Sequence, residues 1–256
     1  MTALDFQDKA RRARFRLIGI GVAVGVVVTG GGVLAVTTLG GGDSGKGSVA
    51  SPAAASESPT PSAGPTKKQT PATGHRYRIQ KGSTAKDGIS VGFGRSQFGA
   101  LSAAVRHLQE LDILDDTIAR KQLEAIVSKD SRDTIDRRIS EVRETREKAG
   151  LSPSGATPAG LSFTTQVNAA RITSADNSGD VVIVWMNYDR YATLPGKGSD
   201  DNPLKGETTY AIYKWEGDDW KLTEEPQYKK RVHGPWAYDP DSPYAFQDMW
   251  REVSVD

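Results

Sequence analysis

The spacing of apolar residues changes near the middle of the chain, and this change limits the fold more than any other feature. Between residues 97 and 149 apolar side chains recur every three or four positions, which predicts helices over 97–111, 116–129 and 132–149. After residue 160 they alternate with polar ones, which predicts strands over 161–173, 180–194, 207–215 and 220–224. The apolar face of a sheet must be covered, and the three predicted helices are the candidates to cover it. We therefore expect an α+β fold with three helices packed on a curved four-stranded antiparallel sheet.

A second feature is the uncharged apolar run from Leu17 to Leu39, 23 residues long. At about 1.5 Å per residue it would cross a hydrocarbon core of about 30 Å. Residues 1–16 form a basic tip, which predicts a cytoplasmic N-terminus and a C-terminal domain outside the cell membrane. A cleaved signal peptide is the alternative, but its apolar region would be shorter and followed by a small-residue cleavage site.

The predicted membrane helix contains two glycines four residues apart, Gly21 and Gly25. This spacing lets two membrane helices approach closely, so both residues are candidates for helix packing. The simpler interpretation is that glycine is common in membrane helices. The expected location is thus a cell membrane crossed once, with or without pairing of the helix.

Three further segments follow the apolar run. Residues 40–74 are rich in Gly, Ser and Pro, which is typical of a linker without regular structure. Residues 75–226 carry the helical and alternating patterns and form the expected outer domain. Residues 227–256 form a tail that is unusually rich in aromatic residues.

Composition excludes several classes of function. The chain has no cysteine, so disulfides, thiol nucleophiles and cysteine-based metal sites are absent. The three histidines His75, His107 and His233 lack the spacing of metal ligands, and we place His107 on the polar side of its helix. From residue 76 to 256 there are 25 basic and 28 acidic side chains, a net charge of −3, which disfavours nucleic acid. We expect no cofactor and no metal.

The predicted hairpin carries a family resemblance. Tyr210–Trp215, the turn Glu216–Asp219 and Trp220–Leu222 together resemble the last hairpin of the nuclear-transport-factor-2-like superfold. Residues 89–100, followed by an alanine-rich helix, are similar to membrane-anchored actinobacterial proteins of this type. Those proteins resemble the TcpC-like subunits of conjugation and type IV secretion systems. The resemblance covers roughly residues 75 to 226 and includes no catalytic motif.

This resemblance implies a noncatalytic single-pass membrane protein that presents a protein-interaction domain as a scaffold of a conjugation or secretion assembly. The expected partners are the membrane and proteins of that assembly, with a homo-oligomer as a further option. The alternative is a small-molecule binder, or a lyase- or isomerase-like enzyme, that uses the cone-shaped cavity of the superfold. The candidate cavity residues are Tyr188, Asp189, Tyr191 and Tyr210.

The tail concentrates aromatic residues in a short segment punctuated by prolines. These residues either pack back onto the sheet or form an interface, because Trp and Tyr are favoured at the centres of interfaces. The candidate interface residues are Trp236, Tyr238, Tyr244, Phe246 and Trp250.

Overall fold

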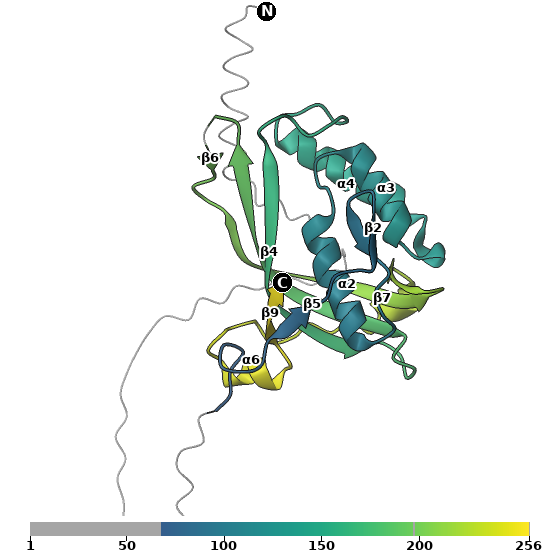
Figure 1. Cartoon of the computed structure of the whole chain (residues 1–256), viewed down its shortest axis with the longest axis vertical. Helices are drawn as coiled ribbons and strands as arrows, with labels where there is room; N and C mark the ends of the chain where they lie inside the picture. Colours follow the sequence, from purple (N-terminus) through teal and green to yellow (C-terminus); the bar gives the residue numbers. More distant parts are fainter. Residues whose placement is uncertain (1–67, 197, 256) are drawn as a thin grey trace, which may run out of the picture. The chain divides into compact units, whose positions relative to one another are not determined.

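The computed structural model describes residues 68–196 and 198–255. These residues form an α+β domain in which helices cover one face of a long, curved sheet (Figure 1). The elements are, in chain order, β1 (Tyr77–Ile79), β2 (Thr84–Lys86), β3 (Ile89–Val91), α2 (Gln97–Glu110), α3 (Asp116–Ile126), the 3₁₀ helix η1 (Lys129–Ser131), α4 (Thr134–Lys148), β4 (Ser162–Ser174), β5 (Val181–Leu194), β6 (Gly198–Ser199), β7 (Leu204–Glu216), β8 (Asp219–Thr223), α5 (Pro226–Lys229), α6 (Pro243–Gln247) and β9 (Arg251–Val255).

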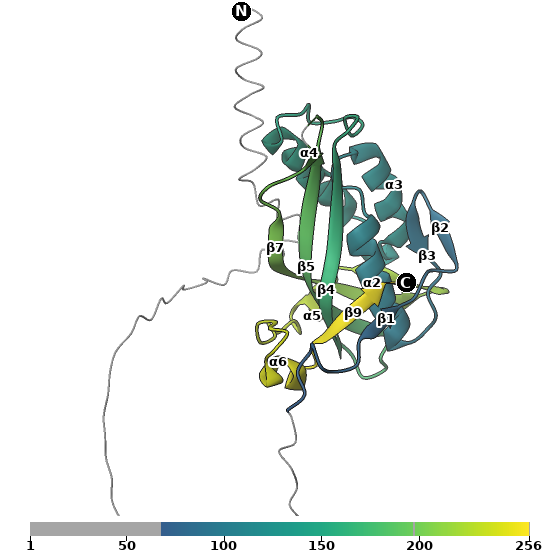
Figure 2. The same cartoon turned by 60° about the vertical axis from the view of Figure 1, so that its left-hand side comes forward.

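The sheet has seven strands in the order β1-β9-β4-β5-β7-β8, with β6 paired to the end of β5. The four predicted strands correspond to β4, β5, β7 and β8, which are antiparallel neighbours. The expectation of a four-stranded antiparallel sheet is nevertheless wrong. The C-terminal tail supplies β9, which pairs with β4 and lies parallel to β1, so the sheet is larger and mixed. Figure 2 shows β9 and β1 beside β4.

The three predicted helices begin and end near their expected positions because their capping residues are present. The Ser96 hydroxyl accepts a hydrogen bond from the Gly99 amide at 3.0 Å, and Asp115 caps α3 in the same way. Gly150 ends α4 with a φ of +74°, a conformation that glycine adopts at little cost.

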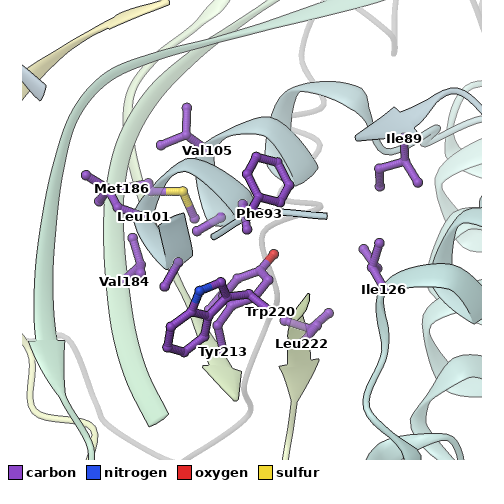
Figure 3. Packing of buried hydrophobic residues seen from close by; sticks show 14 of the residues in the cluster. Ile89, Phe93, Leu101, Val105, Ile126, Val184, Met186, Tyr213, Trp220 and Leu222 are labelled. Carbon is purple, nitrogen blue, oxygen red and sulfur yellow. The ribbon is translucent and has the colours of Figure 1, made fainter. Parts of the chain in front are cut away.

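We call the sheet face that the helices cover the inner face and the opposite one the outer face. Along β5, Val182, Val184 and Met186 pack with the helices, whereas Val181 and Ile183 belong to a cluster on the outer face. Figure 3 shows that Tyr213 and Trp220 fill the space between the sheet and α2, together with Met186 and Leu101. Both faces of the central strands are therefore buried, which explains the long apolar run that opens β5.

Two irregularities interrupt the long strands at the same level of the sheet. The pairing of β4 with β5 shifts at Asn168, and the pairing of β5 with β7 shifts at Asp189. The Asn168 amide donates to Asp189 Oδ1 at 3.1 Å, and that oxygen also accepts from the Gly206 amide at 2.8 Å. Such bulges bend strands and increase their twist, so these polar contacts stabilise the curvature of the sheet.

The expectation of a single-pass membrane protein requires correction. Within 68–196 and 198–255, no helix is both long and apolar enough to cross a bilayer. The longest helix there is α4, with 15 mostly polar residues, and a crossing needs about 20 apolar ones. The predicted span 17–39, with Gly21 and Gly25, lies outside the described residues, as do residues 1–16 and 40–67. The structure of the described residues therefore does not support the predicted membrane anchor, membrane location or extracellular placement.

Candidate functional site

The aromatic tail covers part of the outer face of the sheet. Tyr228 and Val232 pack on a cluster that contains Ile183 and Ile212, and Tyr238 and Trp250 pack around Ala169. The indole of Trp185 contacts both clusters. Burial of these side chains explains why the tail returns to the sheet before β9 begins.

Asp248 fixes the path of the tail. Its carboxylate accepts hydrogen bonds from Arg171 Nη2 at 3.0 Å and from the Trp236 amide at 2.8 Å. The carbonyl of Trp236 accepts a further bond from Trp250 Nε1 at 2.9 Å. Both backbone polar groups of Trp236 are thus held by side chains, one of which belongs to the fully buried Trp250.

The side chain of Trp236, in contrast, lies in solvent. It is 67% exposed and stacks on Tyr244, which is 62% exposed, with ring centroids 5.8 Å apart and an interplanar angle of 15°. Tyr244 belongs to α6, whose first turn is capped by Ser242 and begins with Pro243. A stacked Trp–Tyr pair held from behind by buried groups forms the most exposed aromatic feature of the described residues. We call it the aromatic pair.

The remaining candidate interface residues are placed differently. Trp250 is buried at 0% exposure, so its ring is part of the core. Tyr238 is half-buried against Trp250, and Phe246 is half-buried beneath the guanidinium of Arg251. A Cβ on Gly74 would lie 2.5 Å from the Phe246 ring, so α6 packs tightly on residues 70–74. Of the five predicted residues, only Trp236 and Tyr244 present most of their surface to solvent.

The loop between the paired rings is acidic. From Gly234 to Trp250 the chain has three aspartates and neither lysine nor arginine. Asp248 is paired with Arg171, whereas Asp239 and Asp241 are exposed. Burial raises the pKa of Tyr238 to about 12, and the charges of Glu252, Asp239 and Asp241 act in the same direction. The charge of Arg76 acts in the opposite direction.

A small cavity lies on the inner face between α2, α4 and the sheet. Its volume is about 60 Å³, well below the several hundred Å³ of a typical ligand site. Tyr213, one of its lining residues, belongs with Trp220 to the buried core cluster (Figure 3). The lining residues with polar side-chain atoms are His107, Arg138, Glu141, Thr209, Tyr210 and Tyr213.

His107 is buried and lines this cavity, and does not lie on a polar surface as predicted. Its Nδ1 is 2.9 Å from the Tyr213 hydroxyl, and its Nε2 is 2.8 Å from the Ser90 carbonyl oxygen. Burial lowers the pKa of His107 to about 4 and raises that of Tyr213. The ring is therefore neutral at physiological pH, with both nitrogens in hydrogen bonds. Its position on the stripe of Ala100, Ala103 and Ala104 is the sequence signal that the prediction missed.

The carboxylates near the inner cavity are ionised and paired. Burial raises the pKa of Glu224, but the guanidinium groups of Arg138 and Arg137 outweigh burial and lower it overall. Burial likewise raises the pKa of Asp219, and amide donors and Lys221 reverse the shift. Neither group is held protonated near neutral pH, as a general acid would have to be.

A second pocket of about 240 Å³ lies between the end of α2 and the start of β4. Gln109 Nε2 donates to the Thr165 carbonyl at 3.4 Å, and Thr165 Oγ1 accepts from Arg190 Nε at 3.0 Å. Both oxygens of Glu110 accept bonds from Ser90. The polar lining is thus largely satisfied by the protein itself.

The four candidate cavity residues are not gathered in one site, because Tyr210 lines the inner cavity and Tyr188, Asp189 and Tyr191 do not. Tyr188 lies on the inner face beneath the guanidinium of Arg190, 5.2 Å from the ring centroid. Tyr191 donates to Asp189 at 3.1 Å near the bulge. Tyr210 stacks on Trp185 on the outer face, with centroids 4.8 Å apart. Successive side chains of a strand point to opposite faces of the sheet, and these residues occupy both odd and even positions, so their side chains lie on both faces.

Among residues 68–196 and 198–255, no cluster of His, Asp or Glu has the geometry of a metal site. No protein-family model, no curated protein and no solved structure matches this chain. The functional argument therefore depends on the geometry of the chain itself.

Proposed function

We propose that the described domain is a noncatalytic protein-binding domain whose contact surface centres on the aromatic pair. The observation that carries the proposal is the contrast between the backbone and the side chain of Trp236. The backbone is held by Asp248 and Trp250, while the indole is left 67% exposed.

Such an arrangement suits binding for a thermodynamic reason. Ordering a side chain on association costs about 0.5–1.5 kcal/mol, and a residue that is already held does not pay this in full. Large, rigid aromatic residues are also the commonest centres of protein interfaces. The aromatic pair thus offers a large apolar contact and loses little side-chain entropy on association.

The inner face supports the alternative function less well. Its cavity is small, its buried carboxylates are ionised, and its polar groups bond to one another. A lyase or isomerase of this architecture would need space for a substrate beside a tuned acid or base. Participation in a conjugation or secretion assembly stays a prediction that depends on the family resemblance alone.

The proposal is tested by photo-crosslinking in the cells that produce the protein. A photoreactive amino acid at position 236 should capture a protein, and the same amino acid at position 118 should not. Ile118 is a matched control because it is another exposed apolar residue, 41% exposed, on α3.

The captured protein is then purified and titrated against the wild-type domain, Trp236→Ala and Ile118→Ala. We expect Trp236→Ala to weaken binding at least tenfold, which corresponds to about 1.4 kcal/mol, and Ile118→Ala to leave it unchanged. Equal affinity of all three domains would contradict the proposal, and so would the absence of any protein crosslinked from position 236.

A further inference from the structure

We infer that the segment bound by the aromatic pair is a peptide that presents lysine or arginine side chains. This inference rests on the proposed function and specifies the chemistry of the partner. Two observations carry it: the stacked and exposed rings of Trp236 and Tyr244, and the uncompensated carboxylates of the loop that joins them.

The two aspartates lie close to the ring-bearing residues along the chain. Asp239 follows Trp236 by three residues, and Asp241 precedes Tyr244 by three, so each lies within about 10 Å along the chain of a ring-bearing residue. The Asp241 amide donates to Asp239 Oδ1 at 2.9 Å, and the Ser242 amide donates to the Asp239 carbonyl. These bonds form a compact turn in the loop that joins the two ring-bearing residues.

Several basic side chains around this loop are engaged by groups of the protein. Arg171 pairs with Asp248, Arg76 pairs with Glu252, and the guanidinium of Arg251 donates to the carbonyls of Phe246 and Trp250. On α5, the ammonium of Lys229 lies 3.5 Å from Glu224. Asp239 and Asp241 are exposed and take part in none of the ion pairs found among residues 68–196 and 198–255, so a bound partner can reach their charges.

Aromatic faces and carboxylates attract the same kind of group. A lysine ammonium or an arginine guanidinium over a Trp or Tyr ring is stabilised by about 0.5–1 kcal/mol at an exposed site, and more when water is excluded. Complementary charge also raises the rate of encounter and rejects acidic partners. A membrane surface fits less well, because anionic lipid attracts basic residues and residues 234–250 contain none.

The test uses two labelled ten-residue peptides and fluorescence anisotropy. One peptide repeats Gly, Pro and Lys, and the matched control has Glu at every Lys position. We expect the lysine peptide to bind the wild-type domain, with affinity falling as salt is raised from 50 to 500 mM, and the glutamate peptide to bind at least tenfold more weakly.

Two variants test the contributions separately. Trp236→Ala should weaken binding of the lysine peptide about tenfold. Asp239→Asn/Asp241→Asn should weaken its binding about three- to tenfold and reduce the salt dependence of the affinity. Asn keeps the Oδ1 acceptor of the turn, and an unchanged melting temperature shows that each variant is folded. Equal binding of the two peptides, or no effect of the Asp variant, would overturn the inference.

Other outcomes separate this inference from the proposed function. If position 236 crosslinks to an acidic or wholly apolar segment of a protein, the basic partner is refuted and the protein-binding function stands. If Trp236 instead mediates binding to phosphatidylcholine vesicles and captures no protein, both are refuted.

Discussion

At the scale of single residues, the same amino-acid type serves opposite purposes within one segment. Trp236 and Trp250 are joined by a hydrogen bond from the indole of one to the carbonyl of the other, yet one ring lies in water and the other is fully buried. Position in the tertiary structure, and not residue type, decides whether each contributes to stability or to binding.

Trp250→Ala should destabilise the domain by about 3–5 kcal/mol, because it removes a large buried ring and leaves a cavity between Tyr238 and Ala169. Trp236→Ala should cost less than about 1 kcal/mol, because its ring is exposed and its backbone bonds remain. Urea unfolding of the two variants measures both values. Similar losses in the two would contradict the assignment of their roles.

His107 should make stability depend on pH below neutrality. Its pKa of about 4 lies below the ordinary value of 6.5, so the unfolded chain binds more protons between these two values. Stability is therefore greatest above about pH 6.5 and falls as the pH drops towards 4. From pH 7 to pH 5 this one group should remove about 2 kcal/mol of the free energy of unfolding.

The variant His107→Gln tests this assignment, because glutamine retains a donor and an acceptor but does not titrate in this range. We expect urea unfolding of the variant to change less between pH 7 and pH 5 than that of the wild type. An identical pH dependence in the two proteins would show that another group is responsible.

At the scale of elements, the tail completes the sheet. Arg251 and Glu252 of β9 pair with β4, and Val253, Ser254 and Val255 pair with β1. The short strand β1 has β9 as its sheet neighbour in the described part of the chain. A segment at the end of the chain thus secures one near the start of the described residues.

Ending the chain after Trp250 should therefore release β1 while the helices remain. We expect the amides of residues 77–79 to lose protection in hydrogen exchange, and those of α3 and α4 to keep it. A chain that ends at Ser254 is the matched control, because it retains the pairs of Tyr77 and Arg78. Protection of residues 77–79 in both chains would contradict this account.

At the scale of the whole molecule, a buried ion pair connects the helical layer to the sheet. Arg138 of α4 donates to Glu224, which follows β8, at 2.6 Å, and both side chains are less than 10% exposed. Arg137 and Lys229 also contact Glu224. Desolvating such charges is costly, so the network depends on every partner being present.

Glu224→Gln should destabilise the domain by about 3–5 kcal/mol, because it leaves the Arg138 guanidinium buried without a counter-charge. The double variant Arg138→Met/Glu224→Gln should be more stable than Glu224→Gln alone, since it removes that buried charge. Thermal or urea unfolding in a double-mutant cycle measures the coupling. Additive effects would show that the two residues do not act as a pair.

Periodicity and caps were sufficient to predict the regular core of the fold. The helices α2 and α4 and the strands β5 and β7 have patterns that depend on neighbouring residues alone. The short strands β1 and β9 were missed, because three or five residues carry too little periodicity and their pairing joins segments about 175 residues apart.

Local sequence by itself determined the three long helices, the strands β4, β5, β7 and β8, and that the tail is unusually aromatic, because these follow from side-chain spacing and composition. Tertiary structure alone decided that the sheet is mixed, that His107 is buried, and that Trp250 enters the core while Trp236 stays outside. The physical reason is that burial depends on what the rest of the chain places against a residue. Asp248, Arg171 and Ala169 hold the tail in the position that separates the two indoles.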